Sequence, residues 1–403
     1  MKPTALIWKC LASTLLLLWA ASLSQCTHPS SASSRLHSPD LTPTPVSVSP
    51  ALIREVLSSV RTRKEISALN DYYDSRFNRN FNGAILVARK GVVLFEKYQG
   101  YANLKTREPI GPHTSFQLAS TSKPFTAMSI LWLMQQGRLR LSDSVQKYIP
   151  GFPYPGITLK DLLSHRSGLP NYLYFCDSLW TRPSRLMSNQ DVIDLMIRHH
   201  PLAEFPPNRH FQYCNTNYLI LALVAEKVSG MPLGRFMDSI FFRPLGMTDT
   251  HLYDPATGDP GPDQSVSYDY RGREEALVPA DGVVGDKNIF STVEDLLKWD
   301  QALYRGKLFT PQTLAAAFTP YSNEHPGIRN YGLGWRLLVY KDGDKVVYHN
   351  GWWHGDNSVF YRFIGDSTTL IMLCNKYDRG IYQVQPIWKI LHESPGVTDN
   401  GEE

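Results

Sequence analysis

Both ends of the chain carry strand patterns, whereas the middle reads as helices. Residues 83–98 form two apolar runs around a turn at 89–91, which predicts a β-hairpin. Four further strand-like runs fill the last third, and two of them flank a turn at 341–344. Residues 120–245 show helical runs joined by Pro- and Gly-rich loops. We therefore expect an α+β fold: an antiparallel sheet built from both chain ends, flanked by helices, with a mostly helical inserted subdomain.

Glycines and apolar periodicity predict where several helices lie. The first helix of the insert is expected to end at Gly137, and a second, over residues 217–228, is expected to stop at Gly230. Outside the insert, a helical stripe begins at Ala51. A last amphipathic helix is expected over residues 381–391.

Residues 1–26 read as a signal peptide and not as part of the fold. Two lysines precede the apolar run 11–23, which is short for a transmembrane helix. The segment resembles a bacterial lipoprotein signal, in which Cys26 becomes the lipid-bearing N-terminus. Gln25 departs from the small residue usual before that cysteine. We expect an exported protein, anchored by lipid at Cys26 in the periplasm or at the outer membrane, with plain secretion as the alternative.

The remaining chain divides by composition. Residues 27–50 are rich in Ser, Pro and Thr and predict a flexible tether. Residues 51–395 form the predicted folded domain, and residues 396–403 form a tail. Hydrophobic residues make up 42% of the 403 residues and charged residues 19%, which is typical of a folded protein. The net charge of +4 is spread without a basic block, so the sequence gives no electrostatic argument for nucleic-acid binding.

The remaining cysteines and the histidines predict no metal site. Cys176, Cys214 and Cys374 have no metal-ligand spacing and are expected to be buried or free thiols, with at most one disulfide. The histidines lack an H-E-x-x-H or comparable pattern. His165, in the turn S-H-R-S-G, is expected to make a structural hydrogen bond in its loop. We expect no metal and no cofactor.

A serine and a lysine three residues apart head the apolar run PFTAMSILWLM. On a helix, Ser120 and Lys123 share one face, which brings an amine within hydrogen-bond reach of a hydroxyl, as an activated serine requires. The alternative is a helix cap followed by an exposed lysine. The same spacing recurs at Ser144 and Lys147, where the sequence is more typical of a surface helix start.

Three patterns in chain order favour the first pair. They are Ser120-x-x-Lys123, Tyr213-x-Asn215 before a helix-like run, and His349-x-Gly351 at the end of a strand. With these patterns the chain resembles the serine β-lactamase-like family of class C β-lactamases, D-alanyl-D-alanine carboxypeptidases, D-aminopeptidases and esterases. The stretches TLKDLLSHRSGLPNY, RPLGMTDT and GVVGDKNIFSTVEDLLKW also match the family. The resemblance covers about residues 51–390 and implies the β-lactamase/transpeptidase-like fold.

The resemblance implies an acyl-transfer site. Ser120 attacks a carbonyl, and Lys123 takes its proton, provided that burial and neighbouring cations lower the lysine's pKa. Tyr213 shares that proton and passes it to the leaving group. Asn215 holds the lysine amine and the substrate. A core tyrosine and a helix cap are the alternative for the second pattern.

The third pattern implies residues that bind the substrate. The backbone N–H groups of Ser120 and Trp352 stabilise the oxyanion. Gly351 lets the strand approach the substrate closely. His349 steers the proton of the catalytic tyrosine or binds a substrate carbonyl or carboxylate. A structural histidine is its alternative, and Trp352 fits the pocket rim or the core equally well.

The predicted function is hydrolysis of esters or amides through a covalent acyl-enzyme on a small-molecule or peptide-like acyl substrate. His349 stands where a lysine is common in the β-lactamase branch, and a neutral histidine recognises a carboxylate less strongly. The sequence therefore favours an esterase or D-amino-acid peptidase. The alternatives are a penicillin-binding D,D-peptidase, a weak class C-like β-lactamase, or a catalytically silent binding or sensor module. The sequence does not determine the oligomeric state.

Overall fold

The computed structural model describes residues 47–77, 81–253, 263–306 and 308–392. These residues all fall within one unit, Ser38–Glu403. The predicted signal peptide with Cys26, most of the predicted tether and the tail 396–403 lie outside the described residues.

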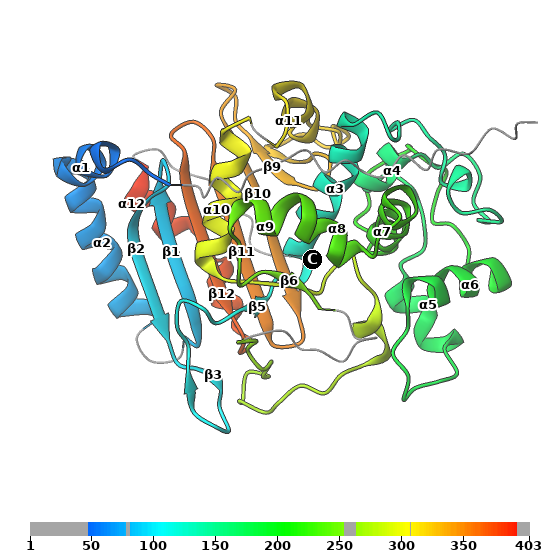
Figure 1. Ribbon diagram of the computed structural model, residues 1–403, viewed down its shortest axis with the longest axis horizontal. Helices are drawn as coiled ribbons and strands as arrows, with labels where there is room; N and C mark the ends of the chain where they lie inside the picture. The colour runs from blue at the N-terminus through cyan, green and yellow to red at the C-terminus, as the bar shows by residue number, and fades with distance from the viewer. Residues whose placement is uncertain (1–46, 78–80, 254–262, 307, 393–403) are drawn as a thin grey trace, which may run out of the picture. The chain divides into compact units, whose positions relative to one another are not determined.

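A seven-stranded antiparallel sheet joins the two ends of the described chain. Its strand order is β2-β1-β12-β11-β10-β9-β8 (Figure 1). The ends meet where β1 pairs with β12, in a register that runs from Gly83 opposite Cys374 to Arg89 opposite Thr368. The α+β sheet predicted from both chain ends is therefore confirmed. The bounds are β1 Gly83–Arg89, β2 Val92–Gln99, β8 Arg329–Tyr331, β9 Arg336–Val339, β10 Lys345–Trp353, β11 Asp356–Phe363 and β12 Thr368–Cys374.

Helices cover both faces of this sheet. Alternating strand residues point to opposite faces, so Leu86 and Phe360 join one core cluster while Val87 and Tyr361 join the other. Helices α2 and α12 pack on the second face; α10, α3 and α7 belong to the first (Figure 1). The bounds are α1 Pro50–Ser58, α2 Val60–Arg76, α3 Lys123–Gln135, α4 Leu159–Leu163, α5 Tyr172–Leu179, α6 Asn189–His199, α7 Thr216–Ser229, α8 Leu233–Met237, α9 Arg243–Leu245, α10 Val293–Tyr304, α11 Pro311–Ala317 and α12 Gln385–Leu391.

Two small sheets accompany the main sheet. Their strands are only two or three residues long. One pairs β3 with β4, and the other has the order β5-β7-β6, of which β5 lies shortly before α3 in the chain. The bounds are β3 Tyr101–Asn103, β4 Glu108–Pro109, β5 Phe116–Gln117, β6 His251–Leu252 and β7 Ile289–Ser291.

The glycine stops are confirmed, whereas two helix predictions need correction. Helix α7 ends at Gly230, which adopts the left-handed conformation (φ 75°) that glycine accepts without strain. The N-terminal stripe divides into α1 and α2 because Ser59 ends one helix and its side chain caps the next. The last helix starts only at Gln385, since Pro386 has no N–H to donate and fits the first turn of a helix.

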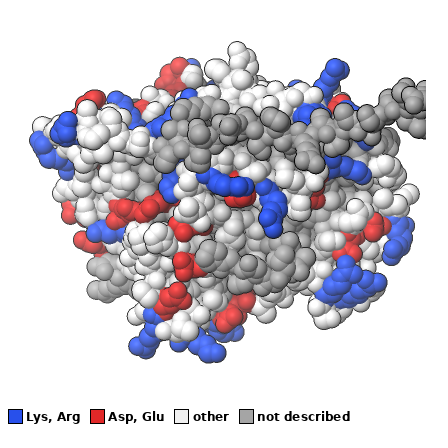
Figure 2. All heavy atoms as spheres, viewed as in Figure 1, with Lys and Arg blue, Asp and Glu red and all other residues white. Residues whose placement is uncertain are grey.

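The described residues also bear on membranes, thiols and surface charge. None of the helices in this part of the chain is both long and apolar enough to span a bilayer. Cys176, Cys214 and Cys374 are buried free thiols, as expected. Acidic and basic side chains are interspersed among the described residues visible in Figure 2.

Candidate active site

Ser120 lies on a tight turn that leads into α3. A single 3₁₀ turn, Ala119–Ser122, precedes the helix. Ala119 has a φ of 48°, a left-handed conformation that is strained for a residue with a side chain. Strand β11 holds the start of this turn, since the Ser358 hydroxyl donates to the Leu118 carbonyl at 2.6 Å. The nucleophile predicted from the sequence is thus fixed at a buried bend at the head of the helix.

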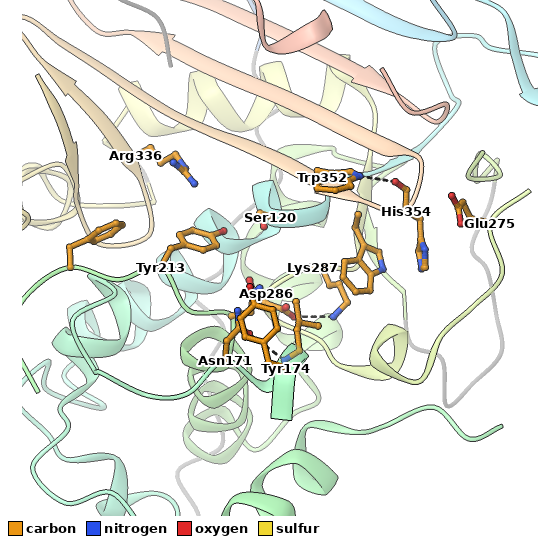
Figure 3. Close-up of a pocket in the computed structure, with 14 residues that line it drawn as sticks. Ser120, Asn171, Tyr174, Tyr213, Glu275, Asp286, Lys287, Arg336, Trp352 and His354 are labelled. Carbon is orange, nitrogen blue, oxygen red and sulfur yellow. Dashed lines mark hydrogen bonds and ion pairs between the residues drawn. The ribbon is translucent and has the colours of Figure 1, made fainter. Parts of the chain in front are cut away.

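Lys123 is fully buried and points at the serine. Its Nζ donates to Ser120 Oγ at 2.9 Å and to the backbone carbonyl of Asp286 at 3.0 Å. The amine lies 4.9 Å from the centre of the Tyr213 ring. Ser120 and Tyr213 both line a pocket of about 630 Å³ (Figure 3). The structure therefore brings together the three residues predicted to be catalytic.

The second S-x-x-K pair is a surface feature. Lys147 is 54% exposed, and its Nζ donates to Asp143 at 2.8 Å. Ser144 sits before a short 3₁₀ turn and pairs in a β-bridge with Thr158. The structure agrees with the sequence in favouring Ser120.

A buried histidine contacts the segment that carries Tyr213. His165 is fully buried, and its Nδ1 accepts from the Cys214 backbone N–H at 3.1 Å. Its ring lies 4.4 Å from that of Tyr213, centre to centre. Burial, reinforced by the charge of Lys123, holds the His165 pKa well below its usual value, so the imidazole is neutral. The predicted structural hydrogen bond of His165 is confirmed. Asn215 lines the pocket just before α7.

Strand β10 comes very close to the nucleophile turn at Gly351. A Cβ at this position would lie 2.2 Å from the Leu118 carbonyl oxygen and 2.9 Å from the Ser120 nitrogen. Both contacts are with backbone atoms, which a small side-chain shift cannot relieve. The strand therefore needs glycine to approach the serine. Trp352, the next residue, is 51% exposed and lines the pocket.

His349 lies behind the pocket wall. It is fully buried, with Nε2 3.2 Å from the Tyr331 hydroxyl and Nδ1 2.7 Å from the Asn350 carbonyl oxygen. Burial and, next, the charge of Arg336 hold the pKa of His349 well below its usual value. It is not among the residues that line the pocket. Its predicted contact with substrate stays a prediction.

The pocket itself is aromatic with charges at its edges. Charged or titratable side chains join the lining on both sides of the serine (Figure 3); they are Glu275, Asp286, Lys287, Arg336 and His354. Aromatic rings make up much of the rest, and they are Tyr174, Phe211, Tyr213, Trp352 and Trp353. Such a lining suits a substrate that has both apolar surface and charge.

Sequence reasoning did not single out four charged pocket residues, of which Glu275 is one. Asp286 and Lys287 lie in the stretch GVVGDKNIFSTVEDLLKW, and Arg336 lies in YGLGWRLLVY. An adjacent acid and base inside a largely apolar run was the available signal, because charged residues are seldom fully buried unless paired. Arg336 begins β9, and its guanidinium lies 5.1 Å from the centre of the Tyr213 ring.

No metal-binding cluster stands out in the described part of the chain. There, no group of three His, Cys, Asp or Glu side chains is placed to hold an ion. Asp281 and His354 instead form an ion pair at 3.0 Å beside the pocket. Trp353 Nε1 donates to the same carboxylate at 2.6 Å.

Comparison with known proteins gives the family of the chain and relatives of its fold. The family model for Beta-lactamase matches residues 70–387. Penicillin-binding protein 4* of Bacillus subtilis is 34% identical over 316 residues, which cover 75% of this chain and 70% of that protein. D-amino acid amidase from Ochrobactrum anthropi has a TM-score of 0.66 at 22% identity, covering 83% of this chain and 99% of the amidase. The hydrolase EstCE1 has a TM-score of 0.68 at 19% identity, covering 83% of this chain and 100% of EstCE1.

The two solved structures are too distant in sequence to show more than a shared fold. The family match is broader, because it spans the sheet, the insert and all three sequence patterns. The chain therefore belongs to the β-lactamase family of serine hydrolases.

Proposed function

We propose that this hydrolase cleaves esters or amides through a covalent acyl-enzyme on Ser120, as an esterase or D-amino-acid peptidase. The observation that carries the proposal is the Lys123 amine, which is buried and 2.9 Å from Ser120 Oγ at the base of an open pocket. A lysine with only a structural role would not require a hydrogen-bonded serine that also lines a pocket.

The proposed reaction has two halves. Ser120 Oγ bonds to the substrate carbonyl carbon, and its proton moves to Lys123 Nζ. The bond to the leaving group then breaks, and Tyr213 passes its proton to the departing oxygen or nitrogen while it takes the proton held by Lys123. Water attacks the acyl-enzyme and gives a proton to Lys123, the ester bond to Ser120 breaks, and that proton returns to Ser120 Oγ as the acid is released.

Backbone donors at the turn favour the same chemistry. An oxyanion that forms beside Ser120 needs two N–H groups aimed at one point. Strand β10 passes next to the Ser120 nitrogen at Gly351, and Trp352 follows directly. We infer that the N–H groups of Ser120 and Trp352 form the oxyanion hole.

The test compares Ser120→Ala with Ser144→Ala, which removes the surface serine of the same spacing. Each variant and the unaltered protein receive a short p-nitrophenyl ester, nitrocefin and a fluorescent penicillin. We expect Ser120→Ala to lose turnover and labelling and Ser144→Ala to keep both. An unaltered protein that neither turns over nor becomes labelled would instead support a silent binding module. Turnover that survives Ser120→Ala would move the nucleophile elsewhere.

A penicillin-binding D,D-peptidase is the second candidate, and Arg336 favours it. The sequence argument against carboxylate recognition rested on His349, a neutral side chain. Arg336 lines the same pocket beside Tyr213 and brings a permanent positive charge. A guanidinium there suits the carboxylate of a penicillin or of a peptide C-terminus.

Arg336→Gln tests this candidate. If the guanidinium binds a carboxylate, penicillin labelling should slow about tenfold or more relative to turnover of a neutral ester. Arg182→Gln, at an exposed position away from the pocket, serves as the control. An equal loss of both activities would assign Arg336 to the fold and not to carboxylate binding.

We further propose export with a lipid anchor at Cys26, supported by the apolar run 11–23 that ends near this cysteine. The measurement is membrane association and incorporation of labelled fatty acid in a bacterial host. Cys26→Ala should release the protein to the soluble fraction. A labelled or membrane-bound Cys26→Ala protein would contradict the proposal.

A further inference from the structure

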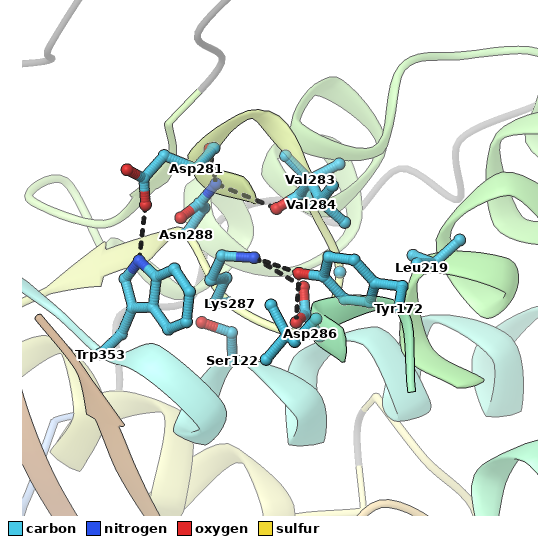
Figure 4. Close-up of polar contacts among 12 residues, drawn as sticks. Ser122, Tyr172, Leu219, Asp281, Val283, Val284, Asp286, Lys287, Asn288 and Trp353 are labelled. Atoms are coloured by element: carbon cyan, nitrogen blue, oxygen red, sulfur yellow. Dashed lines mark hydrogen bonds and ion pairs between the residues drawn. The ribbon is translucent and has the colours of Figure 1, made fainter. Parts of the chain in front are cut away.

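Two oppositely charged neighbours lie buried in the pocket wall. Asp286 is 2% exposed and Lys287 is 3% exposed, and both line the pocket. Figure 4 shows their side chains turned toward Tyr172, at the start of α5. Charged groups this deeply buried are expensive unless they are paired and hydrogen-bonded.

A tyrosine hydroxyl connects the two charges. Lys287 Nζ donates to Tyr172 Oη at 2.5 Å, and the Tyr172 hydroxyl donates to Asp286 Oδ2 at 3.0 Å. Nζ also lies 3.5 Å from Asp286 Oδ1 and 4.8 Å from the centre of the Trp353 ring. The cluster is therefore neutral as a whole when both side chains are charged.

The same residue, Asp286, also holds the proposed base. Its backbone carbonyl accepts from Lys123 Nζ at 3.0 Å. The loop is firmly placed, since Thr126 Oγ1 donates to the Gly285 carbonyl at 2.7 Å. Gly285 has a φ of 103°, and a Cβ there would lie 2.6 Å from the Tyr218 carbonyl oxygen. The backbone of Asp286 is thus fixed against the Lys123 amine, while its carboxylate contacts Tyr172 and Lys287.

We propose that Lys287 is a positioning residue that keeps Lys123 able to accept a proton, by balancing the negative charge of Asp286. The proposal rests on the proposed role of Lys123 as the base for Ser120. A lone buried carboxylate would favour the protonated ammonium of Lys123, which cannot accept a proton. A cation hydrogen-bonded into the same cluster cancels that effect.

The other titratable groups facing Lys123 do not replace this pair. His165 and His349 are buried, and each has a pKa well below its usual value, chiefly because burial disfavours the imidazolium. Both are therefore neutral near neutral pH. Tyr213 and Tyr218 present ring faces to Nζ, at 4.9 and 5.7 Å.

Two further charges, Asp281 and Arg336, stay unchanged in the test. Asp281 is also close enough to act on Lys287, but its carboxylate pairs with His354 at 3.0 Å. Burial lowers the Lys287 pKa, and Asp286 and then Asp281 oppose that effect. Arg336 adds a fixed positive charge on the far side of the Tyr213 ring.

The experiment records kcat/KM for a neutral p-nitrophenyl ester against pH. Three variants are compared with the unaltered protein: Lys287→Met, Asp286→Asn and the double variant. Because activity requires an unprotonated Lys123, the acid limb should move to higher pH in Lys287→Met, by on the order of one pH unit. It should move to lower pH in Asp286→Asn and return to its original position in the double variant.

Tyr172→Phe is the matched control, because it removes the bridging hydroxyl and keeps both charges. Its acid limb should stay in place even if its melting temperature falls. If Lys287→Met does not fold, the shift to lower pH in Asp286→Asn still tests the proposal. An acid limb that stays fixed in the folded single variants would overturn it, as would a change in KM alone. The Ser120→Ala variant is measured first. If it loses turnover, a fixed acid limb counts against the role of Lys287 and not against the proposed function.

Discussion

Gly351 is the residue at which strand β10 meets the turn that carries Ser120. The backbone contacts that a Cβ would make there, 2.2 Å to the Leu118 oxygen and 2.9 Å to the Ser120 nitrogen, are far inside van der Waals distance. Side-chain chemistry at the site therefore depends on one position without a side chain. The same backbone approach sets where the proposed oxyanion hole lies.

Gly351→Ala should displace the strand or the turn. We expect a loss of about 1–3 kcal/mol in the free energy of unfolding, measured by urea denaturation. Turnover should fall more than this loss of stability explains, because the Ser120 nitrogen moves with the turn. Gly111→Ala is the control, since nothing lies within 4 Å of a Cβ there. Wild-type stability and turnover in Gly351→Ala would remove the strand from the account of the site.

At this scale the sequence indicated part of the site. Ser120 and Lys123 were recognisable because a helix places residues three apart on one face, and the structure confirms that they touch. Lys287 was not recognisable as a site residue, because the Tyr172 hydroxyl that it contacts lies 115 residues away in the chain. Local sequence periodicity gives no information about a contact between residues so far apart in the chain. The same holds for Arg336, which reaches the pocket from a strand in the last third of the chain.

Helix α10 is tied to the sheet by a buried ion pair. Arg362, on β11, is 1% exposed at its side chain, and its Nε donates to Asp300 Oδ1, on α10, at 2.6 Å. Thr369, on β12, donates to the other carboxylate oxygen at 2.7 Å. The pair thus joins one helix to two neighbouring strands that belong to the core of the sheet.

Arg362→Leu should leave the Asp300 carboxylate buried without its cation. We expect a loss of about 3–5 kcal/mol in the free energy of unfolding, by chemical denaturation. Arg243→Leu breaks the exposed pair with Asp238 and should change stability by less than about 1 kcal/mol. Equal effects in the two variants would show that burial of the first pair does not govern its contribution.

Elements were predictable where a local signal decided them. The hairpins and the end of α7 at Gly230 follow from turn residues and glycine conformation. The predicted last helix, residues 381–391, was too long, because the helix begins only at Gln385, and the predicted N-terminal stripe divides into two helices at Ser59. The capping preference of Ser59 and the preference of Pro386 for a first helical turn mark these boundaries, whereas apolar periodicity does not.

Across the whole described chain, the sheet brings both ends together around β1 and β12. This arrangement followed from counting strand patterns at the two ends. The order of the strands and the position of the insert relative to the sheet did not, because they depend on contacts far apart in sequence. The pocket lies where the insert, the sheet and the segment around Asp286 each contribute side chains.

Asp356 should make stability depend on pH. Its carboxyl is buried, and burial raises its pKa to about 7, from 3.8 as the reference value. The folded protein favours the protonated carboxyl of Asp356. Its contribution to stability is fully present below the pKa of the unfolded chain and is lost as pH rises through the pKa of the folded protein. Asp356→Asn should therefore match the unaltered protein near pH 4 and exceed its unfolding free energy by about 2–4 kcal/mol near pH 8.

Denaturation at both pH values is the measurement for this prediction. Asp177→Asn, at an exposed position on α5, is the control and should change stability little at either pH. A gain from Asp356→Asn that is the same at both pH values would contradict the assigned role of its buried carboxyl.

The most direct test of the proposed mechanism is to find the acyl group. The protein is incubated with a fluorescent penicillin and, separately, quenched during turnover of a p-nitrophenyl ester. Peptides are then mapped by mass spectrometry. We predict one acyl adduct, on the peptide that contains Ser120, which disappears in Ser120→Ala. An adduct on another residue, or one that persists in Ser120→Ala, would contradict the account.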